Sequence, residues 1–445
     1  MNKIQYLDFY GIHTFIDFFY IVSIYNKMDL YASGSIRTHY IDPVSFVPNG
    51  RCAFELDASK TAYLTNMRLL DLGCTTDTQV DYTQGLGCLA LIKNIRLMDA
   101  RTELSALRNP AQYLFWKNCN RTNSDNKSQD KYLKRNNLGQ TIAATDNKIT
   151  PVQGAGGPAD TLASGNTNLA YLDLREVFPL LNHLQLLPTS VFRNLRIEIE
   201  FESRPAQQVL ANTARTIDVS RPVLACDFTD NADLVKQGME QLMERGAVWN
   251  EIENDNFTIA AVALAGDTEP RQEVQFQSLA YRGKYVERIL LCKQLSNIAD
   301  GVNGTAVLGY GGVASSQAWL QQNTQMRLNG KNILPGFNGA TGDMERLAMV
   351  ADEWGVATML PGSNYYDWSR MASVTNDAAM AGQQSWDCLR IGARVRELQV
   401  QVSRLNNQDT TAGRTATNDA CVVNLFAEVR KVLSMNANGY TVIYG

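Results

Sequence analysis

The chain has 445 residues, of which 45% are hydrophobic and 19% charged, and its formal net charge is −4. This length exceeds one compact domain, and the apolar fraction is large enough for a sizeable core, so two domains are expected. The near-neutral charge excludes a long-range field that would draw the whole chain to nucleic acid.

The start of the chain carries an aromatic and aliphatic stretch at residues 9–25, which His13 and Asp17 interrupt. It is marginal in length for a membrane span, and it lacks the basic start and small-residue cleavage site of a secretory signal. Three interpretations stay open: an ordered arm that packs on a neighbouring subunit, an upstream extension of the reading frame with the true start at Met28, and an interfacial membrane anchor. Residues 1–30 are therefore treated as an N-terminal arm or extension.

Alternation of apolar and polar residues dominates the rest of the chain. In residues 195–202, four apolar and four charged side chains occupy opposite faces, which predicts a strand with one buried and one solvated face. Residues 398–403 show the same alternation. Further strands are expected at residues 62–70, 88–98, 222–228, 257–264, 274–279, 286–292, 325–328 and 422–433.

Turn and helix signals are fewer. Asn329-Gly330 lies between two apolar segments and predicts a hairpin with a type I′ turn. A helix is expected over residues 232–245, with Asp230 or Asn231 as its N-cap and Gly246 at its end. Shorter helices are expected at residues 109–118, 174–181 and 343–351, whereas residues 118–168 and 301–316 lack any period. The class is therefore all-β with short helices in loops.

A faint internal repeat sets the expected domain boundaries. The strand that begins at residue 195 is followed by an apolar strand at 222, and the strand that begins at 398 is followed by one at 423. The two pairs begin 398 − 195 = 203 residues apart. This distance suits one elaborated β-sandwich per half, so residues 31–229 and 230–445 are expected to form two units, with the helix at 232–245 as connector.

No catalytic, cofactor-binding or metal-binding residues are predicted. The eight cysteines form no C-x-x-C pair and favour free thiols in a reducing compartment, and the three histidines are far apart. Residues 154–159 match a dinucleotide-binding pattern but contain Pro158 and lack a following helix pattern. Glu198, Glu200 and Glu202 are expected on one solvated strand face, and the basic residues 127–135 in a solvated loop.

Several segments together resemble the double jelly-roll major capsid proteins of double-stranded DNA viruses and elements of the polinton, adintovirus and virophage kind. The segments are residues 171–179 (YLDLREVFP), 187–188, 195–200, 326–331 (MRLNGK), 425–433 and 439–444. The resemblance spans roughly residues 30–445, and the first 27 residues match no pattern of that family.

The resemblance implies two tandem eight-stranded jelly-roll β-sandwiches and a major capsid protein without enzymatic activity. It also implies a homotrimer whose six jelly rolls make a pseudo-hexameric capsomer of an icosahedral virion shell. The implied partners are further copies of the chain and penton and minor capsid proteins. An inner membrane is a further partner only under the interpretation of the N-terminal arm as an interfacial anchor, and sequence-specific nucleic acid binding is not expected.

Two other classes stay open at this point. An all-β receptor- or glycan-binding viral surface protein would need an exposed pocket of aromatic and carboxylate groups, and residues 365–368 (YYDW) are the one stretch that could supply it. A β-sandwich hydrolase would need converging titratable groups, which the sequence does not show.

Overall fold

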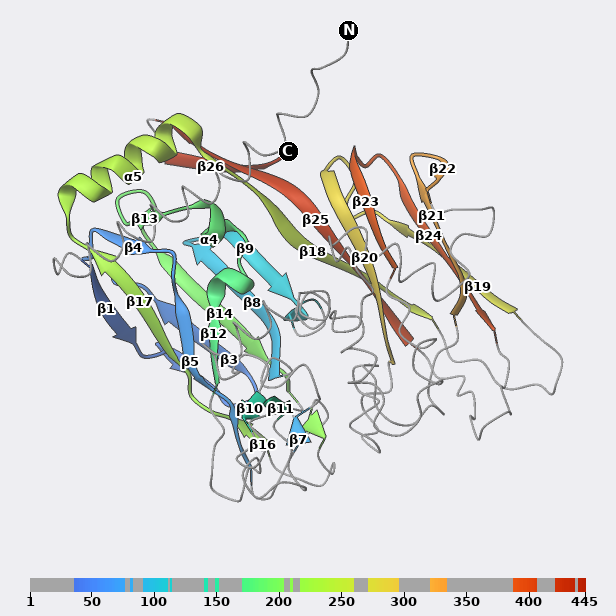
Figure 1. The fold of residues 1–445 in the computed structure, drawn as a ribbon, viewed down its shortest axis with the longest axis horizontal. Coiled ribbons are helices and arrows are strands. Elements are labelled where there is room, and N and C mark those ends of the chain that lie inside the picture. Colours follow the sequence, from blue (N-terminus) through green and yellow to red (C-terminus); the bar gives the residue numbers. More distant parts are fainter. Residues whose placement is uncertain are drawn as a thin grey trace, which may run out of the picture.

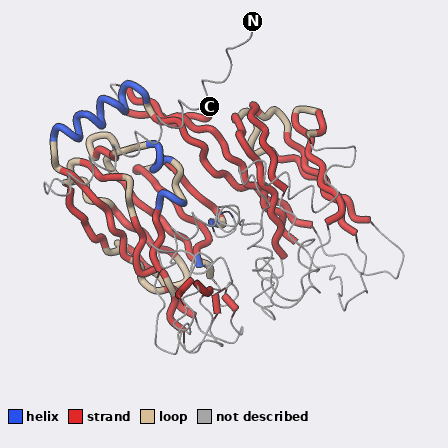
Figure 2. Tube along the Cα trace, in the orientation of Figure 1, coloured by secondary structure: helices blue, strands red, loops and turns tan. Residues whose placement is uncertain are grey.

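The fold is known from a computed structural model. The described residues are 36–76, 81–82, 91–110, 113, 140–142, 149–151, 170–203, 209–210, 217–259, 271–295, 321–333, 387–405, 421–436 and 439–445. Antiparallel strands make up most of them, and they form two β-sandwiches that lie side by side (Figures 1 and 2).

The first sandwich consists of two antiparallel sheets. One sheet has the order β12-β5-β17-β4-β13, with β1 on β17, and the other has the order β2-β3-β14-β8-β9. The bounds of these strands are β1 Ile36–Ile41, β2 Ser45–Phe46, β3 Arg51–Glu55, β4 Ala62–Leu64, β5 Arg68–Leu72, β8 Ile92–Asp99, β9 Thr102–Arg108, β12 Ala170–Asp173, β13 Leu186–Pro188, β14 Leu195–Phe201 and β17 Val223–Thr229. Three two-stranded ladders complete this half: β6 (Cys74–Thr76) with β16 (Ile217–Val219), β7 (Asp81–Tyr82) with β15 (Val209–Leu210), and β10 (Gln140–Ile142) with β11 (Ile149–Pro151).

The second sandwich has sheets of the order β18-β25-β20-β23 and β19-β24-β21-β22, with β26 paired to β25. Its strands are β18 Ala247–Ile259, β19 Arg271–Ser278, β20 Tyr285–Leu295, β21 Gln321–Leu328, β22 Lys331–Asn332, β23 Asp387–Arg394, β24 Leu398–Leu405, β25 Cys421–Asn436 and β26 Gly439–Tyr444. Numbered within this half from β18 to β25, the strands follow the order 1-8-3-6 in one sheet and 2-7-4-5 in the other. This is the strand order of an eight-stranded jelly roll.

The first sandwich has the same order, because β4 with β5, and β13 with β12, are two strands that are each broken in the middle. When each pair is counted as one strand, β1, β17, β4/β5 and β13/β12 give 1-8-3-6, and β3, β14, β8 and β9 give 2-7-4-5. The prediction of an all-β chain with two tandem eight-stranded jelly rolls is therefore confirmed. The repeat in the sequence corresponds to the seventh and eighth strands, which are β14 and β17 in one half and β24 and β25 in the other.

One helix, α5 (Ala232–Arg245), joins the last strand of the first jelly roll to the first strand of the second, and it lies across one end of the first sandwich (Figure 1). Asn231 caps its start by accepting hydrogen bonds from the backbone N–H groups of Asp233 and Leu234, and Gly246 ends it at φ 62°. The expected bounds and caps are confirmed. The helix expected at 174–181 is split into a 3₁₀ turn, η3 (Leu174–Glu176), and α4 (Leu180–His183), while that at 343–351 and most of that at 109–118 fall outside the described residues.

Several strand predictions differ from the observed bounds: the strand expected at 325–328 begins at Gln321, and the one expected at 88–98 is β8, which begins at Ile92. The strand expected at 62–70 breaks between β4 and β5, and the strand expected to begin at residue 257 begins at Ala247. At the break, the Asn66 side chain donates to the buried Asp227 carboxylate and the Thr65 hydroxyl donates to the Leu184 carbonyl.

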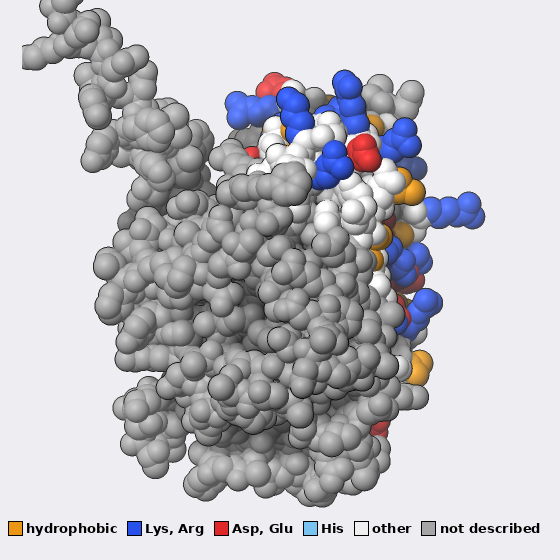
Figure 3. Space-filling model, turned by 90° about the vertical axis from the view of Figure 1, so that its right-hand side faces the viewer, with side chains coloured by type: hydrophobic (Ala, Val, Ile, Leu, Met, Phe, Trp, Pro, Cys, Tyr) orange, Lys and Arg blue, Asp and Glu red, His pale blue; other side chains and the backbone are white. Residues whose placement is uncertain are grey.

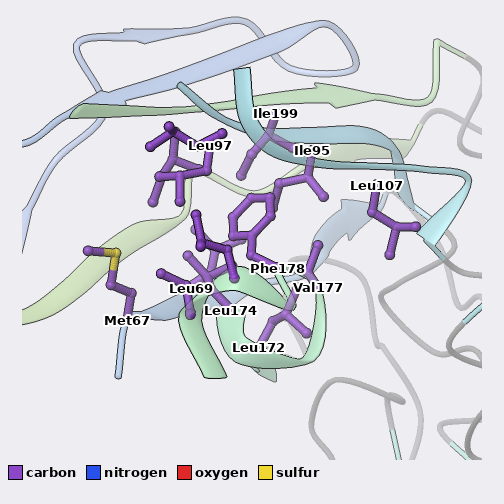
Figure 4. Close-up of a cluster of buried hydrophobic side chains, with 14 of the residues drawn as sticks. Met67, Leu69, Ile95, Leu97, Leu107, Leu172, Leu174, Val177, Phe178 and Ile199 are labelled. Carbon is purple, nitrogen blue, oxygen red and sulfur yellow. The ribbon is translucent and has the colours of Figure 1, made fainter. Parts of the chain in front are cut away.

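The core of the first jelly roll lies between its sheets (Figure 4). Phe178, which follows η3, is fully buried, and in the close-up its ring lies between Ile95 and Ile199 of one sheet and Leu172 of the other. Burial of the thiol raises the pKa of Cys52 to about 12, and Cys226 is likewise buried and free, so these two cysteines behave as core residues.

Candidate functional site

The feature that sets the shape of this molecule is the seam between the two jelly rolls. A single apolar cluster runs through the first sandwich and continues into strands of the second. Trp249 and Ile252 of β18, Leu290 of β20 and Phe426 of β25 belong to it, and all four are buried. The ring of Phe426 packs on Tyr113 at a centroid distance of 5.8 Å, so one face of the β18-β25-β20 sheet packs into this cluster, whereas its other face contributes Ile289, Leu425 and Ala427 to the separate core of the second sandwich.

A buried carboxylate binds the two halves together at this seam. Glu251 of β18 is 1% exposed and accepts hydrogen bonds from Ser105 Oγ at 2.9 and 3.0 Å and from the Ala106 backbone N–H at 2.8 Å. Both donors belong to β9 of the first jelly roll. Trp249 Nε1 donates to the same carboxylate at 2.6 Å.

The charge of Glu251 is balanced from the opposite side. Burial raises the pKa of the Glu251 carboxyl, and the ammonium of the buried Lys431 and the hydrogen-bond donors counteract this shift. Such a buried group costs free energy to desolvate, and it is retained only where every lone pair has a partner. The arrangement therefore fixes the position of β18 against β9.

The C-terminal strand closes the seam at the other side. Tyr440 Oη of β26 donates to Asp99 Oδ2 of β8 at 2.8 Å, and its ring packs on Phe192 at 5.0 Å. The second oxygen of Asp99 accepts from the Asn194 N–H at 2.8 Å, so this carboxylate links three segments of the chain. Burial raises the pKa of the Tyr440 phenol and keeps it a donor.

An open groove of about 430 Å³ follows the seam on its solvent side. Strands β18 and β25 form one wall, and the segment from η3 to α4 forms the other. The charged groups of its lining are engaged with neighbours, because Arg175 pairs with Asp173 at 2.5 Å, Glu428 with Arg288 at 3.3 Å and Arg430 with Glu287 at 3.4 Å. Burial lowers the pKa of His183, which also lines the groove, so this imidazole is neutral at pH 7.

The outer faces of the two sandwiches differ in chemistry. On the first, ion pairs join neighbouring strands, with Arg96 2.6 Å from Glu198 and Lys93 2.9 Å from Glu200. On the second, the cross-strand neighbours Gln275 and Gln401, which stand in register on β19 and β24, are amides, and Gln325 beside them on β21 is already buried. An amide surface costs less to desolvate than a charged one, so the second face is the better suited to close packing.

The structure places the residues that the sequence singled out as follows. Glu198 and Glu200 lie on the outer face of β14, as predicted, but they are ion-paired and only partly exposed. Glu202 departs further from that prediction, because burial raises its pKa to about 7. Residues 127–135, 154–159 and 365–368 lie outside the described residues.

Within the part of the chain that the structure describes, no group of three or more His, Cys, Asp or Glu side chains is arranged to hold a metal ion. No helix among those residues is long and apolar enough to cross a membrane. The sequence had given no indication of the Glu251 network or of the Tyr440–Asp99 bond, since each joins strands that are distant in the chain.

A scan against known protein families finds no match, and neither does a search of curated protein sequences. Solved structures do match. A chain of the Sputnik virophage structure at 3.5 Å resolution by cryo-EM aligns with a TM-score of 0.58 and 11% identity, covering 92% of this chain and 88% of that one. The mavirus major capsid protein aligns with a TM-score of 0.51 and 8% identity, covering 92% and 90%.

The Faustovirus major capsid protein gives a TM-score of 0.51 at 9% identity, with 90% of each chain covered. At such low sequence identity, the structural likeness shows a shared fold and nothing more specific. The alignment extends over both sandwiches. Together with the strand order of the two halves, it defines the protein as an all-β protein of the double jelly-roll fold.

Proposed function

We propose that the chain is the major capsid protein of a double-stranded DNA virus and forms a homotrimeric, pseudo-hexameric capsomer that tiles an icosahedral virion shell. The observation that carries the proposal is the repeated 1-8-3-6 and 2-7-4-5 strand order in two joined sandwiches. It is supported by the likeness of this whole arrangement to proteins named as the major capsid proteins of mavirus and Faustovirus.

The geometry gives a physical reason for a trimer. One chain supplies two wedges of the same topology, so three chains related by a threefold axis supply six. Six similar wedges approximate a hexagon, which tiles a surface. For capsomers to pack side by side, the angle between the two jelly rolls of one chain must not vary. The buried Glu251 network and the apolar cluster at the seam provide that rigidity.

The surface is suited to burial against copies of itself. The amide face of β19 and β24 can be desolvated at low cost, and Tyr40 in β1 and Val44 and Val47 after it are each more than half exposed. Contacts of this kind are individually weak, and a closed shell multiplies them. Further partners proposed on the same basis are penton and minor capsid proteins.

We also propose residues 31–229 and 230–445 as the two structural units and residues 1–30 as an arm that contacts a neighbouring subunit. The protein is proposed to act through its surfaces, without a catalytic or cofactor site, and to reside in the virion shell. These assignments rest on the sequence patterns and on the fold.

Light scattering of the purified protein after size-exclusion chromatography tests the proposal. The expected mass is three times that of the 49.5 kDa chain. Negative-stain electron microscopy of the same fraction should show particles with a near-hexagonal outline. A stable monomer at high concentration, or a monomer that binds glycans on an array, would contradict the capsid assignment and favour a receptor-binding protein.

A further inference from the structure

The end of the second jelly roll at which its short turns meet carries a concentrated positive charge. Three turns come together there: residues 279–284, 329–330 and 395–397. Backbone hydrogen bonds join them, from Gly283 N–H to the Val395 carbonyl at 2.7 Å and from Asn329 N–H to the Glu397 carbonyl at 2.9 Å. The three turns therefore form one continuous surface, here called the turn surface.

Five exposed cations lie on the turn surface or at its border, together with one exposed carboxylate, Glu397. They are Arg282, Arg327, Lys331, Arg394 and Arg396. Five positive charges and one negative charge give a local charge of +4, whereas the whole chain carries −4. Figure 3 shows Lys and Arg side chains gathered at the upper end of this side of the molecule.

These five cations form no salt bridges with the other residues that the structure describes. Among the described residues, no carboxylate forms a salt bridge with any of the five, in contrast to the neighbouring Lys284, which lies 2.6 Å from Glu253. With the residues that the structure describes, the one side-chain hydrogen bond that they make is from Arg327 to the Gly330 carbonyl, at 3.4 Å. Their charge is therefore available to an external anion.

The turn surface is also preorganised. The side chain of Asn329 accepts hydrogen bonds from the backbone N–H groups of Arg396 and Glu397, at 2.8 and 3.2 Å, and donates to the Arg394 carbonyl at 3.2 Å. These bonds hold the backbone of two cationic residues in place before any partner arrives, which reduces the entropy lost on binding.

An exposed apolar residue stands among these charges. Leu279 begins the first turn and is 67% exposed, the highest value among the large hydrophobic residues that the structure describes. The aromatic residue of the same turn, Tyr281, is fully buried, and the ring of the adjacent Tyr444 is already in contact with Lys284, whose Nζ lies 4.2 Å from its centroid, so neither ring is free for a nucleic acid base to stack on. Cations around a protruding aliphatic side chain match the interface of an anionic bilayer, where headgroups meet hydrocarbon.

We propose that the turn surface of the second jelly roll binds the surface of an anionic lipid membrane, with Leu279 inserted between headgroups and the five cations held against them. This goes beyond the proposed capsid role and does not depend on shell assembly. A chain that forms trimers but ignores membranes would overturn this inference alone.

Flotation of the purified full-length protein with phosphatidylcholine vesicles, with and without phosphatidylserine, tests the proposal. Binding is expected only to vesicles that contain phosphatidylserine, and it should weaken as salt is raised. Each cation near an anionic leaflet raises affinity about fivefold, so the triple variant Arg282→Gln, Arg394→Gln, Arg396→Gln should bind roughly 100-fold more weakly. Leu279→Ser should weaken vesicle binding several-fold.

A matched control removes three exposed cations elsewhere: Arg101→Gln, Arg193→Gln and Arg245→Gln in the first half and its connecting helix. It changes the net charge by the same amount and should bind as the unaltered protein does. An equal loss in this control, or no vesicle binding by the unaltered protein, would overturn the proposal. So would binding to duplex DNA as tight as that to vesicles, with Leu279→Ser altering neither.

Discussion

The glutamates at the end of β14 show how strongly a residue's position decides its chemistry. Glu200 and Glu202 are two positions apart and share one side of the chain. The Lys93 ammonium and the Asn94 amide lower the pKa of Glu200, whereas burial raises that of Glu202 to about 7, and the charge of Glu200 adds to the effect. At Glu200 the hydrogen bonds from Lys93 and Asn94 outweigh the effect of burial on the ionised carboxylate, whereas at Glu202 burial is the larger effect.

A pH-dependent stability follows from the raised pKa of Glu202. Between its ordinary pKa of 4.5 and about 7, the folded protein keeps a proton that the unfolded chain has released. The contribution of Glu202 to the free energy of unfolding is therefore fully present below pH 4.5. It decreases as the pH rises, and it is lost as the pH passes 7. Glu202→Gln should raise the free energy of unfolding by roughly 2 kcal/mol at pH 8 and leave it unchanged at pH 4.

Urea unfolding at the two pH values measures this difference. Glu55→Gln serves as the control, because Glu55 is an exposed carboxylate in register with β14 on the same sheet, and it should not change the pH dependence. An equal effect of Glu202→Gln at both pH values would show that the carboxyl is ionised normally in the folded protein.

At the scale of elements, the β21–β22 hairpin does more than reverse the chain. Asn329 and Gly330 have φ of 52° and 84°, as the predicted type I′ turn requires. The Asn329 side chain also bonds three backbone groups of the 394–397 segment. Asn329→Ala removes these bonds and leaves an alanine at positive φ, so we expect a loss of about 2–3 kcal/mol.

Thermal unfolding of Asn329→Ala measures this loss, with Lys331→Ala as a matched control in the same hairpin. Lys331 is exposed and makes no side-chain bond to any described residue, so its removal should change stability by less than about 0.5 kcal/mol. Asn329→Gly keeps the permissive backbone and isolates the side-chain bonds. If Asn329→Ala unfolds like the unaltered protein, the three bonds do not hold the turns together.

The sequence predicted those helices and strands whose signals lie in consecutive residues. The alternation of β14 and the caps of α5 are local signals, and both elements occur where the sequence places them. The sequence did not predict the first half of β18, because its apolar and polar residues do not alternate between the two faces of the strand. Glu251 shares a face with Ala247 and Trp249, since all three pack into the seam, while Val248 on the other face is exposed. A glutamate at a buried strand position is a tertiary feature, which no local period reveals.

At the scale of the whole molecule, the seam makes the two jelly rolls one folding unit. The apolar cluster and the Glu251 network both cross from one sandwich to the other. Opening the seam would expose the rings of Trp249 and Phe426 to water and would take from the Glu251 carboxylate its two donors in β9, Ser105 and Ala106. Neither half can therefore loosen without a large cost to the other.

Glu251→Ala tests this coupling at its centre. The substitution leaves Lys431 buried without its counter-charge and removes the acceptor for donors of β9 and β18, so we expect a loss of about 3–5 kcal/mol. Calorimetry should show one cooperative transition for the unaltered protein and a much lower midpoint, or two separate transitions, for the variant. Glu244→Ala, on the exposed side of α5, is the control and should unfold like the unaltered protein.

The double variant Glu251→Gln, Lys431→Met separates the charge from the packing. It removes both buried charges, and glutamine still accepts from the β9 donors, so it should recover much of the stability that Glu251→Ala loses. Recovery together with a single transition would assign the rigidity of the seam to shape and hydrogen bonding. Persistent separation into two transitions would show that the bonds from Ser105 and Ala106, which cross between the jelly rolls, require the charged carboxylate of Glu251. An unaltered protein that already melts in two independent steps would mean that the wedges are not rigidly coupled, and the geometric argument for a six-wedge capsomer would lose its basis.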